Sequence, residues 1–326
     1  AYRIHQTVNI DDRHSTLFVK HKATNDPTTE VVPTSPWEKR LRKHIERFKQ
    51  AIFKTEDPVM QSYALVQSIL PKLLNNSDFD LVHLHWINNE MLSIKDIGHL
   101  KKPVVWTLHD MWPFCGGEHL AFDFRWRDGY LRSNRPAYES GIDLNRWIWQ
   151  RKLKNWTHPI QIVTPSNWLA SCVKNSVLMS TWPVAVIPNP IDTDFWMPID
   201  KVSVRRELNL PEDVALILSG SLFANAKPHK GFDLLLEALP AIQQGQRKVE
   251  LLVLGDVPDI LKEHCALKVH NIPRTDDDDI VRALYNAADV VVVPSRMESF
   301  GQFASEALSC GTPVAAFAAT GLLDVV

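Results

Sequence analysis

The segment ESFGQFASEALSCGTPV, residues 298–314, places a carboxylate on each side of a glycine: Glu298 precedes Gly301, and Glu306 follows it. The segment comes directly after the apolar run VVVV at 290–293, which predicts a strand that leads into a helix. A helix N-terminus suits phosphate, and carboxylates accept hydrogen bonds from hydroxyls. The pattern fits a diphosphate with a sugar at each end, and it also fits two surface acids near a helix start.

The composition excludes several classes of protein. The chain has 326 residues, 45% hydrophobic and 23% charged, with a formal net charge of −2, which allows two domains and does not favour nucleic acid as a partner. No apolar run approaches the roughly 20 residues of a membrane span, and no signal-peptide pattern opens the chain. Four cysteines without C-x-x-C spacing predict reduced thiols in a cytoplasmic protein.

Predicted strands and helices alternate along the chain. The strands are short and almost continuously apolar, which is typical of parallel strands covered on both faces. They span residues 16–20, 80–85, 103–108, 160–164 and 184–187, and then 214–219, 249–254, 268–272, 289–293 and 313–317. The helices span 37–54, 58–75, 143–155, 166–174, 231–244, 277–287 and 301–310. This order predicts an α/β protein with two Rossmann-like, doubly wound domains.

The segment NPIDTDFWMPIDK, residues 189–201, is rich in Pro and Asp and predicts a hinge. We expect an N-terminal domain over residues 1–195 and a C-terminal domain over residues 196–326. Residues 1–9 have a helical pattern with no strand before it, and the chain ends soon after its tenth predicted strand. We therefore expect both domains to be incomplete at the ends of the chain.

Several motifs carry a resemblance to a known family. PSRMESFGQFASEALSCGTPVAAF, residues 294–317, resembles the E-x7-E segment of retaining GT-B glycosyltransferases of family 4. GSLFANAKPHKGFDLLLEAL at 220–239 resembles the family's G-R-L…K-G segment, and TLHDMWPF at 107–114 resembles its N-domain His-Asp turn. PSNW at 165–168 and IPNPID at 187–192 also match. TLHDMWPF together with KPHKGFDLLLEAL resembles colanic-acid-type bacterial polysaccharide transferases.

The resemblance implies the GT-B fold, in which an N-terminal acceptor domain and a C-terminal donor domain face a cleft. It implies that Glu298 lies beside the donor sugar, that Glu306 binds the ribose and that Lys230 meets the diphosphate. The other implied donor contacts are Gly220, Ser221, Phe300, Gly301 and Gln302. The family's arginine is Ser221 here, which removes one phosphate-binding charge, and Lys227 and His229 are candidates to replace it.

His109 is the candidate catalytic residue of the N-terminal domain. It ends an apolar strand and precedes Asp110, a further candidate. Without the resemblance, a structural histidine would be the more common reading; the resemblance favours a catalytic one, acting from across the cleft. His83 and His85 alternate on the preceding predicted strand, and we expect structural roles for both, or a place in the lining of the site for His85.

Three charged segments allow more than one interpretation. Residues 38–54 carry seven Lys/Arg and two Glu and fit either a solvated helix or a peripheral helix on anionic lipid. The run TDDDD at 275–279 fits a helix cap better than a metal site. The loop FDFRWRDGYLRSNRP at 122–136 fits an acceptor-binding loop as well as an ordinary surface loop.

Together with these features, the resemblance implies a retaining glycosyltransferase of hexosyltransferase type that moves a sugar from a nucleotide-diphosphate sugar to a hydroxyl acceptor. We expect a carbohydrate or lipid-linked acceptor, a role in polysaccharide or glycolipid synthesis, and no metal or other cofactor. A cytoplasmic location is expected, with peripheral contact at the inner membrane face as an alternative. A nucleotide-sugar epimerase and a non-catalytic nucleotide-sugar-binding protein also fit, whereas a dehydrogenase does not, because no G-x-G-x-x-G follows a strand.

Overall fold

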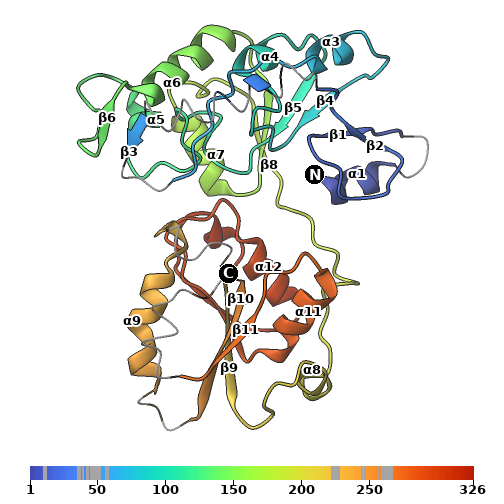
Figure 1. Ribbon diagram of the computed structural model, residues 1–326, viewed down its shortest axis with the longest axis vertical. Helices are drawn as coiled ribbons and strands as arrows, with labels where there is room; N and C mark the ends of the chain where they lie inside the picture. The colour runs from blue at the N-terminus through green and yellow to red at the C-terminus, as the bar shows by residue number, and fades with distance from the viewer. Residues whose placement is uncertain are drawn as a thin grey trace. The chain divides into compact units, whose positions relative to one another are not determined.

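The computed structural model describes residues 1–9, 13–34, 38, 40–41, 44, 53–55, 59–221, 228–243, 245, 247–255, 257 and 267–326. They form two compact units (Figure 1). Unit 1 comprises Ala1–Pro165 and Leu169–Ile187, and unit 2 comprises Ser166–Trp168 and Pro188–Val326. Within the described ranges, no helix has both the length and the apolar character that crossing a bilayer requires.

A four-stranded parallel sheet forms the centre of unit 1. Its strands lie in the order β4 (Val82–Leu84), β5 (Val104–Thr107), β7 (Gln161–Thr164) and β8 (Val184–Val186). Helix α3 (Leu70–Asn75) precedes β4, and α4 (Ile94–Gly98), α6 (Leu144–Asn155) and α7 (Asn167–Asn175) fall between successive strands. All four strands are among those predicted from sequence. Because they are parallel, their carboxyl ends meet at one edge of the sheet.

Two small sheets accompany the main sheet of unit 1. β1 (Leu17–Val19) pairs in parallel with β2 (Thr29–Val31), and β3 (Phe53–Thr55) pairs antiparallel with β6 (Glu139–Gly141). Helices α1 (Tyr2–Val8) and α5 (Arg125–Asp128) also belong to this unit. The predicted strand at 16–20 is therefore a strand, but among the described residues it pairs only with β2 and does not extend the main sheet.

The helix predicted over residues 58–75 is wrong for most of its length, because only α3 at its end is helical. Side chains from elsewhere bind the backbone N–H groups that precede α3. Glu90 Oε2 accepts hydrogen bonds from Leu65 N at 2.7 Å and Val66 N at 2.9 Å. Asp96 Oδ2 accepts one from Ser68 N at 2.9 Å. These bonds satisfy N–H groups that would otherwise need partners inside a helix.

The basic helix predicted over residues 37–54 falls mostly outside the described residues. Glu38, Arg40, Leu41 and His44 are helical. Its carboxyl end is wrong, because residues 53–55 form β3. Antiparallel pairing with β6 gives this stretch a backbone partner that the helical spacing of its apolar residues does not reveal.

Unit 2 is built on a five-stranded parallel sheet. Its order is β11 (Val269–Ile272), β10 (Val249–Gly255), β9 (Ala215–Ser221), β12 (Val290–Val293) and β13 (Val314–Ala316). The helices are α8 (Lys201–Glu207), α9 (Phe232–Gln243), α11 (Asp278–Ala287) and α12 (Gln302–Ser309), with 3-10 turns η2 (Pro228–Lys230) and η3 (Thr320–Asp324). This strand order, 3-2-1-4-5, is that of a Rossmann-like domain. The five predicted strands and the helices α9, α11 and α12 are confirmed; α8 is not among the predictions.

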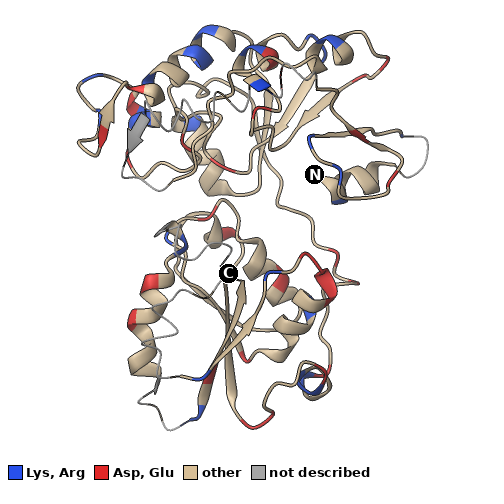
Figure 2. Ribbon diagram, in the orientation of Figure 1, with Lys and Arg blue, Asp and Glu red and all other residues tan. Residues whose placement is uncertain are grey.

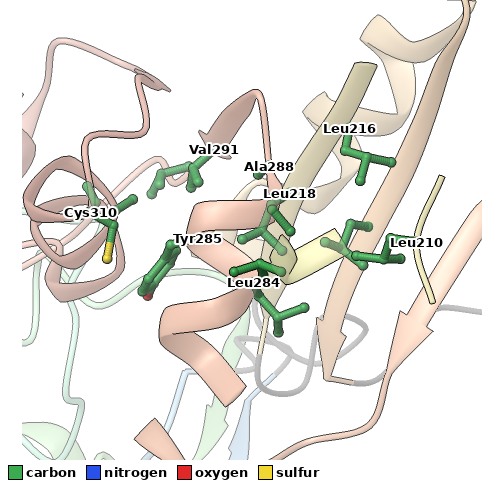
Figure 3. Packing of buried hydrophobic residues seen from close by; sticks show 14 of the residues in the cluster. Leu210, Leu216, Leu218, Leu284, Tyr285, Ala288, Val291 and Cys310 are labelled. Atoms are coloured by element: carbon green, nitrogen blue, oxygen red, sulfur yellow. The ribbon is translucent and has the colours of Figure 1, made fainter. Parts of the chain in front are cut away.

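Apolar residues cover both faces of the unit 2 sheet. Along β9, Leu216 and Leu218 belong to one buried cluster and Ile217 belongs to another. Figure 3 shows the first cluster, which contains Leu284 of α11 as well as Leu216 and Leu218. The alternation of two clusters along one strand explains why this strand is apolar at every position from Ala215 to Leu218, as a parallel strand between two helical layers requires.

The acidic run TDDDD is confirmed as a helix cap. Asp277 Oδ1 accepts a hydrogen bond from Asp279 N at 2.9 Å at the start of α11, where the acidic residues gather in Figure 2. Negative charge at a helix start is stabilised by the helix dipole. In the described part of the chain, no group of three or more His, Cys, Asp or Glu side chains is arranged to hold a metal ion.

Candidate functional site

Gly301 forms the turn between β12 and α12. Its φ of +102° lies in the left-handed region, where a Cβ is unfavourable, and a Cβ built there would lie 2.6 Å from Leu322 Cδ2. Gly301 is also the N-cap of α12, and no side chain caps this helix start. The start of α12 therefore presents the partial positive charge of the helix dipole, which suits a phosphate group.

Lys230 and Glu298, both predicted from sequence, are in direct contact. Lys230 Nζ lies 2.6 Å from Glu298 Oε1, and Ser295 Oγ donates a hydrogen bond to the same oxygen at 2.8 Å. The Glu298 N–H donates to Thr320 Oγ1 at 3.0 Å. The two charged side chains keep 31% and 16% of their surface exposed, so a ligand can reach both of them.

The segment that carries Lys230 lies close against the end of β12. Gly231 has a φ of +64°, and a Cβ on it would lie only 1.8 Å from the carbonyl oxygen of Pro294, so only glycine fits. The His229 carbonyl accepts a hydrogen bond from Arg296 N at 2.8 Å. Arg296 also forms a two-bond ion pair with Asp233, at 2.7 and 2.6 Å. These contacts position Lys230 beside Glu298.

Glu306 is buried on α12, with 8% of its surface exposed. Tyr285 donates a hydrogen bond to its Oε2 at 3.1 Å, and Gln302 Nε2 donates to its Oε1 at 2.9 Å. Burial raises the pKa of Tyr285, and the negative charge of Glu306 raises it further, so this phenol remains a donor at neutral pH. These two bonds fix the orientation of the Glu306 carboxylate.

The remaining donor-site predictions fall at the end of β9 and beside Gly301. A Cβ on Gly220 would lie 2.8 Å from the ring of Phe303, which explains the absence of a side chain there. Ser221 is the last residue of β9, and the predicted contact Lys227 lies outside the described residues. His229 belongs to η2, and the Phe300 side chain is buried, with 7% of its surface exposed, so only its backbone could meet a ligand.

His109 follows β5 in unit 1 and lies beside His85, which follows the neighbouring strand β4. His109 Nε2 and His85 Nδ1 are 3.1 Å apart, and the two ring planes are inclined by 24° with their centroids 5.4 Å apart. Burial, aided by the neighbouring imidazoles of His83 and His109, lowers the pKa of His85 to about 3. Burial also lowers the pKa of His109, against the opposing effect of Asp110. Both imidazoles are therefore neutral at pH 7.

Asp110 is fully engaged in fixing the turn after β5. Its Oδ2 lies 2.6 Å from His119 Nδ1 and accepts a hydrogen bond from Trp86 Nε1 at 3.0 Å, while its Oδ1 accepts one from Trp112 N at 3.0 Å. A carboxylate with these partners holds a turn in shape. The sequence-based predictions do not include the His85–His109 contact or the roles of His119 and Trp86; the H-x-H spacing on β4 was the available signal for His85.

Lys152 of α6 also binds the backbone of the turn that follows β5. It is fully buried, and its ammonium donates hydrogen bonds to the backbone carbonyls of Trp112, Cys115 at 3.0 Å and Gly116 at 2.7 Å. Burial lowers the pKa of Lys152 to about 7, against the opposing negative charges around it, which include Glu118. The residues that follow His109 are thus tied to α6 by one side chain.

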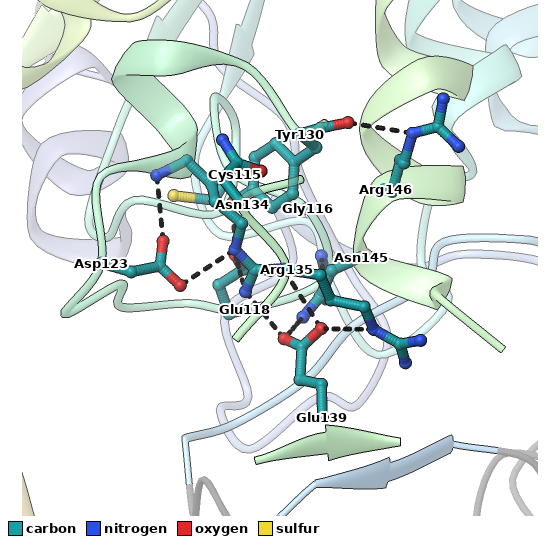
Figure 4. Close-up of polar contacts among 12 residues, drawn as sticks. Cys115, Gly116, Glu118, Asp123, Tyr130, Asn134, Arg135, Glu139, Asn145 and Arg146 are labelled. Carbon is teal, nitrogen blue, oxygen red and sulfur yellow. Dashed lines mark hydrogen bonds and ion pairs between the residues drawn. The ribbon is translucent and has the colours of Figure 1, made fainter. Parts of the chain in front are cut away.

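A buried network of charges occupies the loop at 122–136, which sequence alone assigned either to acceptor binding or to an ordinary loop. Arg125 binds both carboxylate oxygens of Glu139, at 3.1 and 2.7 Å, and its Nε donates to Asp123 at 2.9 Å. Figure 4 shows Asp123, Glu139 and Asn145 within this network, and Asn145 donates to Glu139 at 2.8 Å. Arg125 is only 4% exposed, so its charge stabilises the loop and is not offered to a ligand.

Solved structures with the same architecture include two of low sequence identity. Sucrose-phosphate synthase from Thermosynechococcus elongatus is 18% identical, with a TM-score of 0.61, over 95% of this chain and 71% of that one. Anabaena Alr3699/HepE, in complex with UDP and glucose, is 17% identical, with a TM-score of 0.54, over 91% of this chain and 69% of that one. These similarities show the GT-B fold with two Rossmann-like domains.

Sequence relatives agree with the fold. A D-inositol 3-phosphate glycosyltransferase of Segniliparus rotundus is 33% identical over 150 residues, which cover 43% of this chain and 32% of that protein. The chain spans about a third of the length of the curated relatives that it matches. The family described as Glycosyl transferases group 1 matches residues 214–326, and the one described as Glycosyltransferase Family 4 matches residues 23–195, more than half of the chain. The chain therefore belongs to glycosyltransferase family 4.

Proposed function

We propose that this protein transfers a sugar from a nucleotide-diphosphate sugar to a hydroxyl acceptor. The observation that carries the proposal is the arrangement of Lys230, Glu298 and Gly301 at the carboxyl edge of the unit 2 sheet. An ammonium group and an uncapped helix start both present positive charge there, and doubly wound sheets bind their ligands at that edge. Membership of family 4 and the similarity to curated glycosyltransferases support the same reaction class.

The chemistry of the donor accounts for the two charges of the Lys230–Glu298 pair. As the bond between the anomeric carbon and the diphosphate oxygen breaks, negative charge develops on the diphosphate and positive charge on the sugar. Lys230 and the start of α12 would stabilise the first, so the proposal needs no divalent metal. Glu298 would stabilise the second. We further propose that the anomeric configuration is retained, on the resemblance of the E-x7-E segment.

Glu306 fits the ribose of the nucleotide. Its two oxygens are held in place by Tyr285 and Gln302, and a carboxylate accepts hydrogen bonds from hydroxyl donors. Two neighbouring ribose hydroxyls would supply such donors. In this account, Glu306 contributes to binding of the nucleotide and takes no part in the bond that breaks.

The acceptor side of the proposal rests on one motif from each unit. We propose transfer of a hexose to a carbohydrate or a lipid-linked carbohydrate in polysaccharide or glycolipid synthesis, because TLHDMWPF with KPHKGF resembles transferases of that kind. The curated relatives are named for D-inositol 3-phosphate. That compound therefore belongs among the acceptors to be tried.

A screen of nucleotide sugars by thermal shift tests the proposal. A true donor at a hundred times its Kd stabilises the fold by about 2.7 kcal/mol, which is a measurable rise in Tm. Each hit is then incubated with acceptors and the products are identified. Transfer with retained configuration supports the proposal; an epimerised sugar released without an acceptor identifies an epimerase, and binding without turnover identifies a non-catalytic binding protein. Stabilisation by no nucleotide sugar would contradict the proposal.

A further inference from the structure

The pair His85–His109 stands at the carboxyl ends of the adjacent parallel strands β4 and β5. The register pairs Leu84 with Trp106, which brings the residues that follow the two strands together. Trp106 Nε1 donates a hydrogen bond to the His85 carbonyl at 3.2 Å, so the backbone at His85 is held in place. The 3.1 Å separation of His109 Nε2 and His85 Nδ1 is a hydrogen-bond distance.

Two neutral imidazoles in such a contact share one proton, and only two arrangements are possible. If His109 Nε2–H donates to His85 Nδ1, both rings carry their proton on Nε2. If His85 Nδ1–H donates to His109 Nε2, both carry it on Nδ1. Histidine in water prefers the Nε2–H tautomer, so the first arrangement places both rings in their favoured form, whereas the second places both in the disfavoured one.

We propose that His85 is a positioning residue that accepts a hydrogen bond from His109 Nε2–H and thereby leaves the Nδ1 lone pair of His109 as the acceptor for a substrate hydroxyl. The catalytic consequence rests on the proposed function, whereas the tautomer does not. Should His109 acquire positive charge while it interacts with that hydroxyl, its bond to His85 becomes charge-assisted and stronger. His85 thus takes the place that a carboxylate has in many histidine sites.

The surroundings of the pair favour a neutral acceptor. The ionisable side chains that act on it are His83 on β4, whose ring centroid is 4.3 Å from that of His85, and Asp110 after β5. His83 Nε2 is 2.8 Å from Thr107 Oγ1, so this ring nitrogen is hydrogen-bonded to Thr107. Asp110 is engaged by His119, Trp86 and Trp112 N. In the described part of the chain, neither His83 nor Asp110 is hydrogen-bonded to the His109 ring, whereas His85 is.

Long-range proton–nitrogen spectra of protein labelled with ¹⁵N-histidine test the tautomer directly. Loss of a signal set in His109→Asn assigns the ring, and the wild type is expected to show His109 with a bare Nδ1 and a protonated Nε2. His85→Phe should give His109 a mixture of tautomers. His85→Asn should restore the wild-type form, because its amide oxygen can accept from the same position. His83→Phe is the matched control and should leave the tautomer unchanged.

Turnover supplies the second measurement. His85→Phe should lower kcat by about tenfold or more with KM for the donor little changed, and His85→Asn should recover most of it. A His109 that is protonated on Nδ1 in the wild type overturns the proposal, as does an unchanged tautomer and unchanged kcat in His85→Phe. If the tautomer is as expected but His109→Ala retains full turnover, the positioning of the ring is supported and the assignment of His109 to the proposed function fails instead.

Discussion

The ammonium of Lys230 lies 2.6 Å from Oε1 of Glu298, although the two residues are 68 positions apart in the chain. The contact follows from the sheet, because β9 and β12 are neighbours and each residue follows one of these strands at its carboxyl end. The pair places a cation and an anion where the proposed reaction develops charges of both signs. A diphosphate would compete with Glu298 for Lys230, and the predictions for the donor site depend on this competition.

Glu298→Gln should preserve binding of a nucleoside diphosphate and lower turnover by about a hundredfold or more. The substitution keeps the shape of the side chain but removes the charge that would stabilise the developing cation, and it releases Lys230 from its ion pair. Calorimetry and steady-state transfer assays measure the two effects. Glu212→Gln, which removes an acid from an exposed ion pair with Arg206 in the same unit, is the control. Full turnover in Glu298→Gln would remove Glu298 from the reaction.

Glu306→Ala should weaken binding of a nucleoside diphosphate by about 1–3 kcal/mol but leave binding of inorganic pyrophosphate unchanged, because only the first ligand carries a ribose. Tyr285→Phe removes one of the donors that hold Glu306 and should have a smaller effect. Competition against a fluorescent nucleotide gives both affinities. An equal loss for pyrophosphate would assign Glu306 to the shape of the phosphate site and not to the ribose.

Lys152 should make the stability of the protein depend on pH. Burial lowers its pKa to about 7 in the folded state, whereas an unfolded lysine titrates near 10.4, so between these values the unfolded chain binds more protons. Stability then rises with pH, by at most about 1.4 kcal/mol per pH unit for one proton.

Urea unfolding at pH 7 and at pH 9.5 measures this effect. From the lower to the higher pH, the free energy of unfolding of the wild type should rise relative to that of Lys152→Met. The exposed Lys154, on the same helix, provides the control Lys154→Met, which should follow the wild type. The pKa shift would be contradicted if the free energy of unfolding of the wild type, relative to that of Lys152→Met, stayed constant or fell as the pH rises.

Turnover should survive a chelator. In the proposed site, the positive charge that meets the diphosphate comes from Lys230 and the start of α12, so removal of divalent cations with EDTA should leave the rate unchanged. The assay compares dialysed protein with and without EDTA. Loss of activity that magnesium restores would show that the phosphate site of the proposal is incomplete.

The main sheets were predictable because parallel strands covered on both faces are apolar at nearly every position. The runs that became β9, β10 and β12 are examples, and the helices α9, α11 and α12 follow from their own spacing. The irregular stretch before α3 was not predictable, since its N–H groups are bound by Glu90 and Asp96, which lie 24 to 28 residues further along the chain. Its local composition gives no sign of those partners.

Some residues of the candidate site could likewise be placed from sequence, whereas other contacts could not. Gly301 and Glu298 stand in one continuous motif, so sequence alone could place them at a helix start. The contact of His85 with His109 depends on which strands are neighbours and on their register, which no local pattern encodes. The pairing of Asp110 with His119 likewise depends on a turn that Lys152 fixes from a distant helix.

The most direct test of the account is a calorimetric titration of nucleoside diphosphates into the wild type, Lys230→Ala and Lys268→Ala. Lys268 is an exposed lysine just before β11, at the opposite edge of the same sheet, so its loss changes the net charge equally without touching the proposed site. The account predicts that at least one nucleoside diphosphate binds the wild type and Lys268→Ala with similar affinity and binds Lys230→Ala at least about tenfold more weakly. Equal affinities for all three proteins, or an equal loss in both variants, would contradict the claim that Lys230 forms the diphosphate site.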